Sequence, residues 1–392
     1  MSFSADRIHR RDAENAEFTQ RLNQTKTLPT RGNTINASSL STSSLPSRPL
    51  GIRYFLILWP LFFAICFGLG YPTLRRYDPR TTEGMSDTPK YYAITTGADT
   101  SSFKELFRCR VLVPYVARPF YWFAQAYLPT LNAGFFGLLM ANALFCATTA
   151  CFIVSIGNRL FNDLGTALVG ATLYLLSFTV PNLQLSGLID TGEACFMAAV
   201  IWTLLTGRWY LLPIWGLFGA LAKETFVPFS CVFALTWWFV EGRQNTRRLS
   251  ELKWSELKWI AVLAIVGLAT VMAVHSVVSG QLKWPWNIAG QARAPVNFFV
   301  ALWDCLTERS FWYVFGWLIP LGIWRLKYFP RPWLVASIAT SVLAIILGAY
   351  SNAGGTVGRA TFDIIGPLLS LSVALLIARP SAYLTPAKPE LH

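Results

Sequence analysis

The chain is dominated by a succession of apolar runs, separated by shorter segments that carry most of its charge. The runs lie near residues 51–71, 133–157, 164–181, 187–206, 209–222, 225–240, 258–279, 311–324, 333–350 and 362–378. An apolar run of roughly 17–25 residues is long enough to cross a bilayer as a helix. Only 14% of the residues are charged, whereas a soluble domain carries roughly 25%. The sequence therefore predicts an all-α, polytopic transmembrane helical bundle of about ten spans, with the short pair 209–222 and 225–240 as a hairpin.

The basic residues predict how these spans are oriented. They gather in alternate connections, namely Arg159, Arg208, Arg243, Arg247, Arg248, Lys253, Lys258, Arg325, Lys327, Arg331 and Arg379. Cytoplasmic connections are enriched in Lys and Arg, so the net charge of +13 requires no nucleic acid and both termini are predicted to be cytoplasmic. Residues 1–50, poor in aromatic residues, are predicted to be a disordered tail. The membrane domain is expected over 51–380, with a short cytoplasmic tail at 381–392.

The first outer loop, expected over 73–130, is the longest polar segment of the membrane domain. Phe103, Leu106, Phe107 and Val111 recur there at helical spacing among charged residues. This pattern predicts an amphipathic helix that lies in the membrane interface, and Pro114 and Pro119 are expected to divide it into segments.

Asp87 is the acidic residue of this loop with the clearest context, Ser-Asp-Thr-Pro-Lys-Tyr-Tyr. One interpretation is an N-cap that opens a short helix over Lys90–Ile94. The other is a general base that takes a proton from an acceptor hydroxyl. The two roles are compatible, because a capping carboxylate retains a second oxygen. Asp78 and Glu83 are interpreted as solvated loop residues.

Three arginines in the same loop, Arg108, Arg110 and Arg118, have two open interpretations. Arginine side chains near a membrane surface commonly extend to lipid headgroups. Alternatively, their planar guanidinium groups fit the oxygens of a lipid-linked phosphate.

Charged residues also interrupt the apolar runs. Lys223-Glu224 separates the two short runs, and Asp190 and Glu193 stand three positions apart at the start of another. Because a charge inside the bilayer costs roughly 2.5–3.5 kcal/mol, such residues are interpreted as functional, as partners of an intramembrane cation, or as a tight outer turn in the case of Lys223-Glu224.

The last span is preceded by Gly-Gly-Thr-Val-Gly-Arg-Ala-Thr-Phe-Asp, which contains Arg359 and Asp363. His275 has no second histidine in a span beside it and is interpreted as an interhelical hydrogen-bonding group. The seven cysteines show no metal-ligand spacing. Cys109 and Cys305 lie in polar segments expected on one side of the membrane, and whether they form a disulfide stays open.

Four of these features, in chain order, resemble the GT-C superfamily of polytopic glycosyltransferases, especially bacterial members that use polyprenyl-phosphate sugars. Asp87, with aromatic residues after it, resembles the acidic residue of that family's first outer loop. Arg110-Val-Leu-Val-Pro114 resembles the family's amphipathic loop helices. Lys223-Glu224 falls in a short helical hairpin, and Arg359 precedes the last span, as in the family. The loop lacks the adjacent acidic pair that some members carry.

The resemblance implies an inverting transfer of a sugar to an acceptor hydroxyl on the outer side of a bacterial inner membrane. Asp87 is the expected general base, and the expected substrate-binding residues are Tyr91, Arg108, Arg110, Asp190, Lys223, Glu224 and Arg359. The implied partners are a polyprenyl-phosphate sugar, the bilayer and a glycan, lipid or protein acceptor. No cofactor is implied, and a divalent metal stays open.

Two other classes compete with this interpretation. In a transporter or flippase of a lipid-linked or anionic solute, Asp190, Glu193, Lys223 and Arg359 would line a path; the sequence shows no internal repeat typical of such proteins. A membrane acyltransferase would need a catalytic histidine, for which His275 is the candidate within the spans.

Overall fold

The computed structural model describes residues 52–76, 87–245, 254–285, 287, 297–351 and 354–378, and every regular element among them is helical. The prediction of an all-α chain is thus confirmed for this part of the sequence. The α-helices are α2 (Ile52–Arg76), α3 (Thr88–Thr96), α4 (Glu105–Arg108), α5 (Leu112–Tyr127), α6 (Ala133–Phe161), α7 (Leu164–Leu175), α8 (Thr179–Asn182), α9 (Asp190–Thr206), α10 (Leu212–Ala222), α11 (Phe226–Asn245), α12 (Trp254–Ser279), α14 (Phe298–Thr307), α15 (Arg309–Phe315), α16 (Leu318–Gly322), α17 (Arg331–Tyr350) and α18 (Gly354–Ala378). Three 3₁₀ turns, η1 (Gln184–Ser186), η2 (Trp209–Leu211) and η4 (Ile323–Tyr328), connect some of them.

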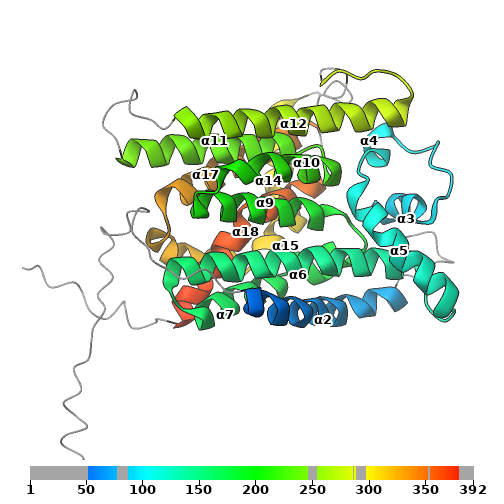
Figure 1. Cartoon of the computed structure of the whole chain (residues 1–392), viewed down its shortest axis with the longest axis horizontal. Helices are drawn as coiled ribbons and strands as arrows, with labels where there is room; N and C mark the ends of the chain where they lie inside the picture. The colour runs from blue at the N-terminus through cyan, green and yellow to red at the C-terminus, as the bar shows by residue number, and fades with distance from the viewer. Residues whose placement is uncertain are drawn as a thin grey trace, which may run out of the picture. The chain divides into compact units, whose positions relative to one another are not determined.

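The long helices run side by side, and the short helices α3, α4 and α5 gather at one end of the bundle, on the right of Figure 1. All of them belong to the unit Leu45–His392. Helix α6 packs against α2, α5, α7 and α9, while α18 packs against α7, α9, α16 and α17. These two helices therefore connect most of the others.

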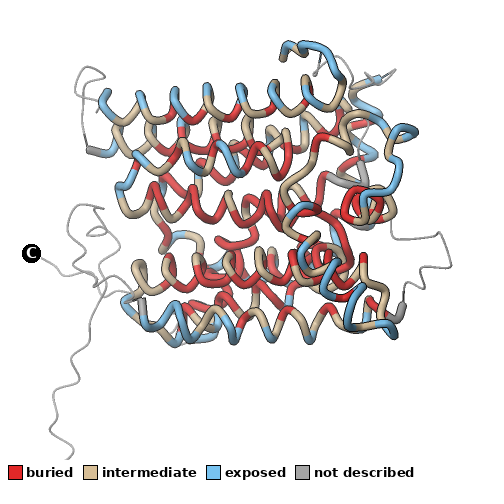
Figure 2. The backbone as a smooth tube through the Cα atoms, turned by 45° about the vertical axis from the view of Figure 1, so that its right-hand side comes forward, coloured by how far each residue is buried: buried red, intermediate tan, exposed pale blue. Residues whose placement is uncertain are grey.

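Burial separates central helices from peripheral ones. In its most apolar stretch α18 is 78% buried and α6 is 67% buried, whereas α2 is only 17% buried. Figure 2 shows the buried backbone concentrated in the interior of the bundle. An apolar helix that is exposed along most of its length, such as α2, is suited to face lipid rather than water.

Within the described residues, six helices are long and apolar enough to cross a membrane. They are Arg53–Leu74, Ala133–Phe161, Leu164–Ser186, Trp254–Ser279, Arg331–Tyr350 and Val357–Ala378. The chain therefore has the character of a multi-helical membrane protein, although six is fewer than the number of apolar runs in the sequence.

Two predicted spans differ from the observed helices. The run near 187–206 becomes α9, which begins only at Asp190 and has 17 residues. The run near 311–324 is divided between α15, α16 and the turn η4, because Gly316 ends α15 in a non-helical conformation with φ 9° and ψ −92°. The predicted hairpin is observed as α10 followed by α11, with Lys223-Glu224 in the connection.

The loop helices also differ from expectation. The amphipathic pattern near 103–111 forms only the four-residue helix α4. Pro119 does not divide the following segment but lies inside the continuous helix α5. Pro114 is the third residue of α5, where the missing backbone N–H has no partner within the helix to lose. Residues 77–86, including Asp78 and Glu83, and both predicted tails lie outside the described residues.

Side-chain caps fix the ends of the central helices. Asn132 accepts a hydrogen bond from the backbone N–H of Phe135 at 3.0 Å and begins α6. Asn162 ends α6 in a left-handed conformation, and Asp163 then accepts from the N–H of Gly165 to begin α7. Such caps satisfy backbone groups that have no partner within the helix. They set the register of α6, which carries much of the core.

Candidate functional site

A buried ionic network lies where α9, α18 and the α10–α11 connection meet. Lys223, only 7% exposed, donates to Asp190 Oδ1 at 2.8 Å and to Glu193 Oε2 at 2.6 Å. Thr225 donates to the other carboxylate oxygen of Glu193 at 2.6 Å. Lys223-Glu224 is therefore not a simple outer turn, because its lysine is an interior cation with two acidic partners. The interpretation of Asp190 and Glu193 as partners of a cation agrees with this geometry.

Arg359 reaches the same network from the last helix. Its NH1 group donates to Asp190 Oδ2 at 2.7 Å, across 169 positions of sequence. The two oxygens of Asp190 are thus shared between Lys223 and Arg359, and the aspartate itself is only 5% exposed. Two cations that sequence reasoning assigned to one site do converge on a single carboxylate.

Asp363 adds a third acidic group, one turn after Arg359 on α18. Its Oδ1 accepts from the side-chain amide of Gln184 at 3.0 Å, while its Oδ2 is buried and has no hydrogen-bond partner among the described residues. Oxygens of Asp190, Glu193 and Asp363 lie within 4.8 Å of one another. Lys223 and Arg359 supply two positive charges beside these three carboxyl groups.

A small residue explains how α9 and α10 approach closely enough for these contacts. A Cβ atom on Gly192 would lie 2.8 Å from the Cβ of Ala222 and 3.2 Å from a methyl carbon of Val113. Glycine at this position therefore brings the first turn of α9 against the last residue of α10. Asp190 and Glu193 flank this contact and face Lys223, which directly follows Ala222.

A second buried pair adjoins the network. Arg110 donates two hydrogen bonds to the carboxylate of Glu224, one from Nε at 3.0 Å and one from NH2. The NH1 group of Arg110 donates to the hydroxyl of Tyr91 at 3.0 Å. Planar two-pronged pairing of this kind is the strongest form of arginine–carboxylate contact. Glu224 is adjacent to Lys223 in the sequence, but its carboxylate binds Arg110, whereas Lys223 binds Asp190 and Glu193.

Burial and charge set the protonation of this pair. Burial raises the pKa of Tyr91 above its usual value, although the positive charge of Arg110 opposes the shift. Burial alone would also raise the pKa of Glu224, but the charge and hydrogen bonds of Arg110 more than offset it and lower the pKa below its usual 4.5. At neutral pH the site therefore contains a neutral phenol, a carboxylate and a guanidinium ion.

Asp87 lies at the start of α3, next to this pair. It occupies the N-cap position, but its side chain makes no capping bond and instead accepts from Lys90 Nζ at 2.6 Å. The side-chain cap predicted from the sequence is therefore wrong, while a short helix after Asp87 is observed over Thr88–Thr96. Negative charges on Asp87 and Asp190 both act on the phenol of Tyr91, which stands between the loop and the buried network.

The other two loop arginines bind the protein backbone. Arg108 donates to the carbonyl of Val278 on α12 at 3.4 Å, and Arg118 donates to the carbonyl of Ile94 at 3.0 Å. Arg118 also lies over the ring of Tyr115, with its guanidinium carbon 4.0 Å from the ring centre. These contacts fix α4 and α5 against their neighbours.

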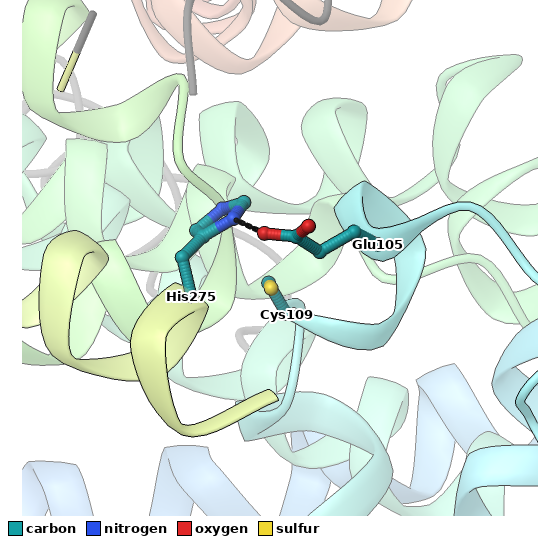
Figure 3. Close-up of side chains that lie close together, drawn as sticks. All are labelled: Glu105, Cys109 and His275. Atoms are coloured by element: carbon teal, nitrogen blue, oxygen red, sulfur yellow. Dashed lines mark hydrogen bonds and ion pairs between the residues drawn. The ribbon is translucent and has the colours of Figure 1, made fainter. Parts of the chain in front are cut away.

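A separate cluster joins α4 to α12. His275 Nδ1 lies 2.9 Å from Glu105 Oε1, so the interpretation of His275 as an interhelical hydrogen-bonding group agrees with the structure. Figure 3 shows Cys109 beside this pair. Cys109 and Cys305 are both free thiols in the structure. Sequence reasoning missed the cluster because its members come from two distant helices.

The buried network is completed by Glu193, Gln184, Thr225 and Asp363, none of which was among the substrate-binding residues expected from the resemblance. A sequence signal existed for Glu193 and Asp363, which stand three and four positions from Asp190 and Arg359 and therefore share a helix face with them. Gln184 and Thr225 carried no comparable signal, because single polar residues beside apolar runs are common.

No family model matches the chain, and no curated protein matches it in a sequence search. The fold and the site therefore define its class on their own: a helical membrane protein with an ionic network buried inside the bundle.

Proposed function

We propose that the chain is a membrane glycosyltransferase, which moves a sugar from a polyprenyl-phosphate donor to an acceptor hydroxyl. The observation that carries the proposal is the convergence of Lys223 and Arg359 on Asp190 inside an apolar bundle. A buried salt bridge adds little net stability compared with apolar packing. Two cations held on one carboxylate are suited instead to receive a ligand of high negative charge, such as a phosphate.

In the proposed reaction Asp87 acts as the general base, and Lys223 and Arg359 stabilise the leaving phosphate. Asp87 takes the proton of the acceptor hydroxyl. At the same time the oxygen of that hydroxyl forms a bond to the anomeric carbon of the donor sugar. The bond between that carbon and the phosphate oxygen breaks on the opposite face, which inverts the anomeric configuration. The electron pair leaves with polyprenyl phosphate, where the growing negative charge is stabilised by Lys223 and Arg359.

Asp190 keeps the two cations in place before the donor binds. A lysine has three N–H donors and an arginine has five, so a donor phosphate could accept hydrogen bonds from Lys223 and Arg359 without displacing Asp190. Tyr91 and Arg110 extend this polar region toward Asp87. The proposal therefore places the base and the cations on opposite sides of the donor sugar.

Donor binding by purified variants tests the role of the cations. Lys223→Ala and Arg359→Ala are expected to weaken binding of a polyprenyl-phosphate sugar and to lower turnover. Arg359→Lys should restore both only in part, because lysine lacks the planar fork. Arg243→Ala, an exposed arginine at the end of α11, is the matched control. If Lys223→Ala and Arg359→Ala bind the donor like the wild type, the two cations are structural.

Asp87→Asn tests the base. The change retains the shape of the side chain but removes its charge, and it should lower the release of polyprenyl phosphate by about 10²–10⁴-fold. Asp99→Asn changes an exposed acid in the same segment and should leave the rate unchanged. A wild-type rate for Asp87→Asn, in protein that is normally folded, would exclude Asp87 as the base.

A transporter or flippase is the second candidate, because one feature of the network favours it. Asp363 Oδ2 is buried without a partner among the described residues, and carboxyl groups inside a helix bundle commonly bind and release protons during coupled transport. Proteoliposomes distinguish the two functions. Movement of a labelled lipid-linked sugar between leaflets without cleavage supports the transporter, whereas release of polyprenyl phosphate that requires an acceptor supports the transferase.

A further inference from the structure

The structure brings together three potential metal ligands that play no part in the proposed transfer. Glu105 and Cys109 lie one turn apart, at the start of α4 and at the residue that ends it, and His275 comes from α12. One ligand atom from each residue lies within 4.8 Å of the other two. In Figure 3 the imidazole of His275 faces the carboxylate of Glu105, with the side chain of Cys109 beside them.

We propose that Glu105, Cys109 and His275 bind one divalent cation of the zinc type. Sulfur, imidazole nitrogen and carboxylate oxygen are the three donors that zinc uses in proteins. Bonds of roughly 2.0–2.3 Å place the donors of a tetrahedral zinc ion about 3–4 Å apart, so the observed spacing needs only small side-chain adjustments. Three protein ligands leave a fourth position for water.

A second observation points to a missing ligand. His275 is only 1% exposed, and its Nε2 is buried with no hydrogen-bond partner among the described residues. A buried polar atom without a partner is costly, and a neutral imidazole commonly satisfies both nitrogens by binding a metal with one and a carboxylate with the other. A half-turn of the ring about its Cβ–Cγ bond would move Nε2 into the place of Cε1, next to the position that Nδ1 now holds beside Glu105.

The surroundings of the sulfur also favour a cation. The negative charges of Glu105 and Glu224 both act on the buried sulfur of Cys109. A bound cation would offset these charges by coordinating the thiolate. Binding then releases the thiol proton to solvent, so the affinity rises with pH.

A lysine side chain competes with the proposed ion. Lys283 Nζ lies 3.4 Å from Glu105 Oε2 and supplies a positive charge beside the carboxylate. The ion must displace this ammonium group from the carboxylate. Removing the lysine charge should therefore strengthen metal binding.

The proposed ion would also organise the neighbouring site. Arg110 follows Cys109 directly, and its side chain holds Glu224 and Tyr91. A metal that links Cys109 to α12 would fix the backbone from which Arg110 extends. In this respect the metal would position Arg110 and would take no part in the proposed transfer itself.

The test is titration of the full-length, chelator-treated protein in detergent with Co²⁺, a spectroscopic substitute for zinc. We expect one ion per chain and a near-ultraviolet charge-transfer band that requires the thiolate of Cys109. Cys109→Ser should abolish the band, and His275→Gln should weaken binding by at least about tenfold, the smallest loss seen when even an outer partner of a ligand is changed. Cys305→Ser, a buried free thiol elsewhere, is the matched control and should bind like the wild type.

Two further measurements remain decisive if a ligand variant fails to fold. Lys283→Met should bind Co²⁺ more tightly than the wild type, and the wild-type affinity should rise by about tenfold per pH unit near neutral pH, because one thiol proton is displaced. The absence of a charge-transfer band in wild type and Lys283→Met, or a band that survives in Cys109→Ser, would overturn the proposal. None of these readouts depends on sugar transfer.

Discussion

At the scale of single residues, the Arg110–Glu224 pair carries the clearest electrostatic consequence. Both side chains are mostly buried, at 13% and 16% exposed, and they form a two-pronged contact. Removing one partner of such a pair leaves an uncompensated charge and typically costs about 3–5 kcal/mol. Glu224→Gln should therefore destabilise the protein, because the guanidinium of Arg110 remains in place without a carboxylate.

The same pair predicts how stability depends on acid. Arg110 lowers the pKa of Glu224 below its usual 4.5 in the folded protein, so the pair stabilises the fold above the unfolded pKa and is lost as pH falls through the folded value. Thermal unfolding in detergent between pH 7 and pH 3 should show this loss in the wild type. Glu224→Gln should lose less stability over the same range. If the wild type and Glu224→Gln lose equal stability between pH 7 and pH 3, the Arg110–Glu224 pair does not contribute to the acid dependence of stability.

A second residue-scale prediction concerns the reactivity of Cys109. Its pKa of about 12 leaves a thiolate fraction of about 10⁻⁴ at pH 8, far below that of an ordinary cysteine. Alkylation of the chelator-treated protein with a maleimide, followed by peptide mass spectrometry, should label Cys109 very slowly at pH 8. The labelling rate should rise roughly tenfold with each pH unit while the fold persists. Rapid labelling at pH 8 would show that the thiol is neither buried nor held protonated.

Charge pattern at this scale predicted which residues gather but not how they pair. Lys223 and Asp190 were recognised because an ionisable residue that interrupts apolar runs needs a partner. Arg359 was recognised from its place before the last span, and the structure brings these three residues together. The partner of Glu224 was not predictable, since Arg110 lies 114 positions away and looked like a membrane-surface residue. The cluster of Glu105, Cys109 and His275 was hidden for the same reason. Pairing depends on helix packing, which single-residue chemistry does not encode.

At the scale of helices, hydropathy predicted the positions of the apolar segments. It was a poorer guide to whether each segment forms one continuous helix. The run near 311–324 contains Gly316 and breaks there, although its composition suits a span. Pro119, by contrast, was expected to break a helix that in fact continues through it. Helix α5 lies along α6, and such packing can offset the one hydrogen bond that a proline removes. Tertiary contacts therefore decided both cases.

The turn before α9 provides an element-scale prediction, because it positions α3. Gly187 has φ +94°, and a Cβ there would lie 2.6 Å from the methyl carbon of Thr88, the first residue of α3. Gly187→Ala should therefore lower the stability by about 1–3 kcal/mol through backbone strain and this clash. Gly97→Ala is the matched control, because Gly97 also has a positive φ, of +76°, but no atom within 4 Å of the added Cβ.

Denaturant unfolding in detergent measures this difference. Gly187→Ala should be less stable than Gly97→Ala, and adding Thr88→Ser to Gly187→Ala should restore part of the loss by removing the clashing methyl group. If both glycine variants lose equal stability and Thr88→Ser restores none of it, the contact between the turn and α3 does not contribute to the fold.

At the scale of the whole bundle, the charged site and the basic connections lie at different ends. Helices α3, α4 and α5 gather on the right of Figure 1, whereas the C-terminal end of α11 and the start of α12 lie on the left. Helix α12 has 26 residues and so extends about 39 Å, which exceeds the roughly 30 Å of a bilayer core. The two ends are therefore far enough apart to face opposite sides of a membrane.

Because the two ends are separated, reporter fusions can test the topology predicted from the charge pattern. A reporter active only in the cytoplasm should be active when fused after Gln244 or after Gly207, because both connections carry the basic residues expected inside. A fusion after Ala98, in the segment between α3 and α4, should be inactive and should instead activate an outward-facing reporter. Residue 292, a further outer position predicted from the sequence, lies outside the described residues.

Each pattern of reporter activity has a distinct meaning. Activity of one reporter at both Gln244 and Ala98 would show that the two ends of the bundle face the same compartment, so that the helices between them do not cross the membrane. A complete reversal would retain the crossing but move Asp87, Tyr91 and Arg110 to the cytoplasm. The donor sugar would then be delivered from inside the cell, and the proposed transfer would require a cytoplasmic acceptor hydroxyl.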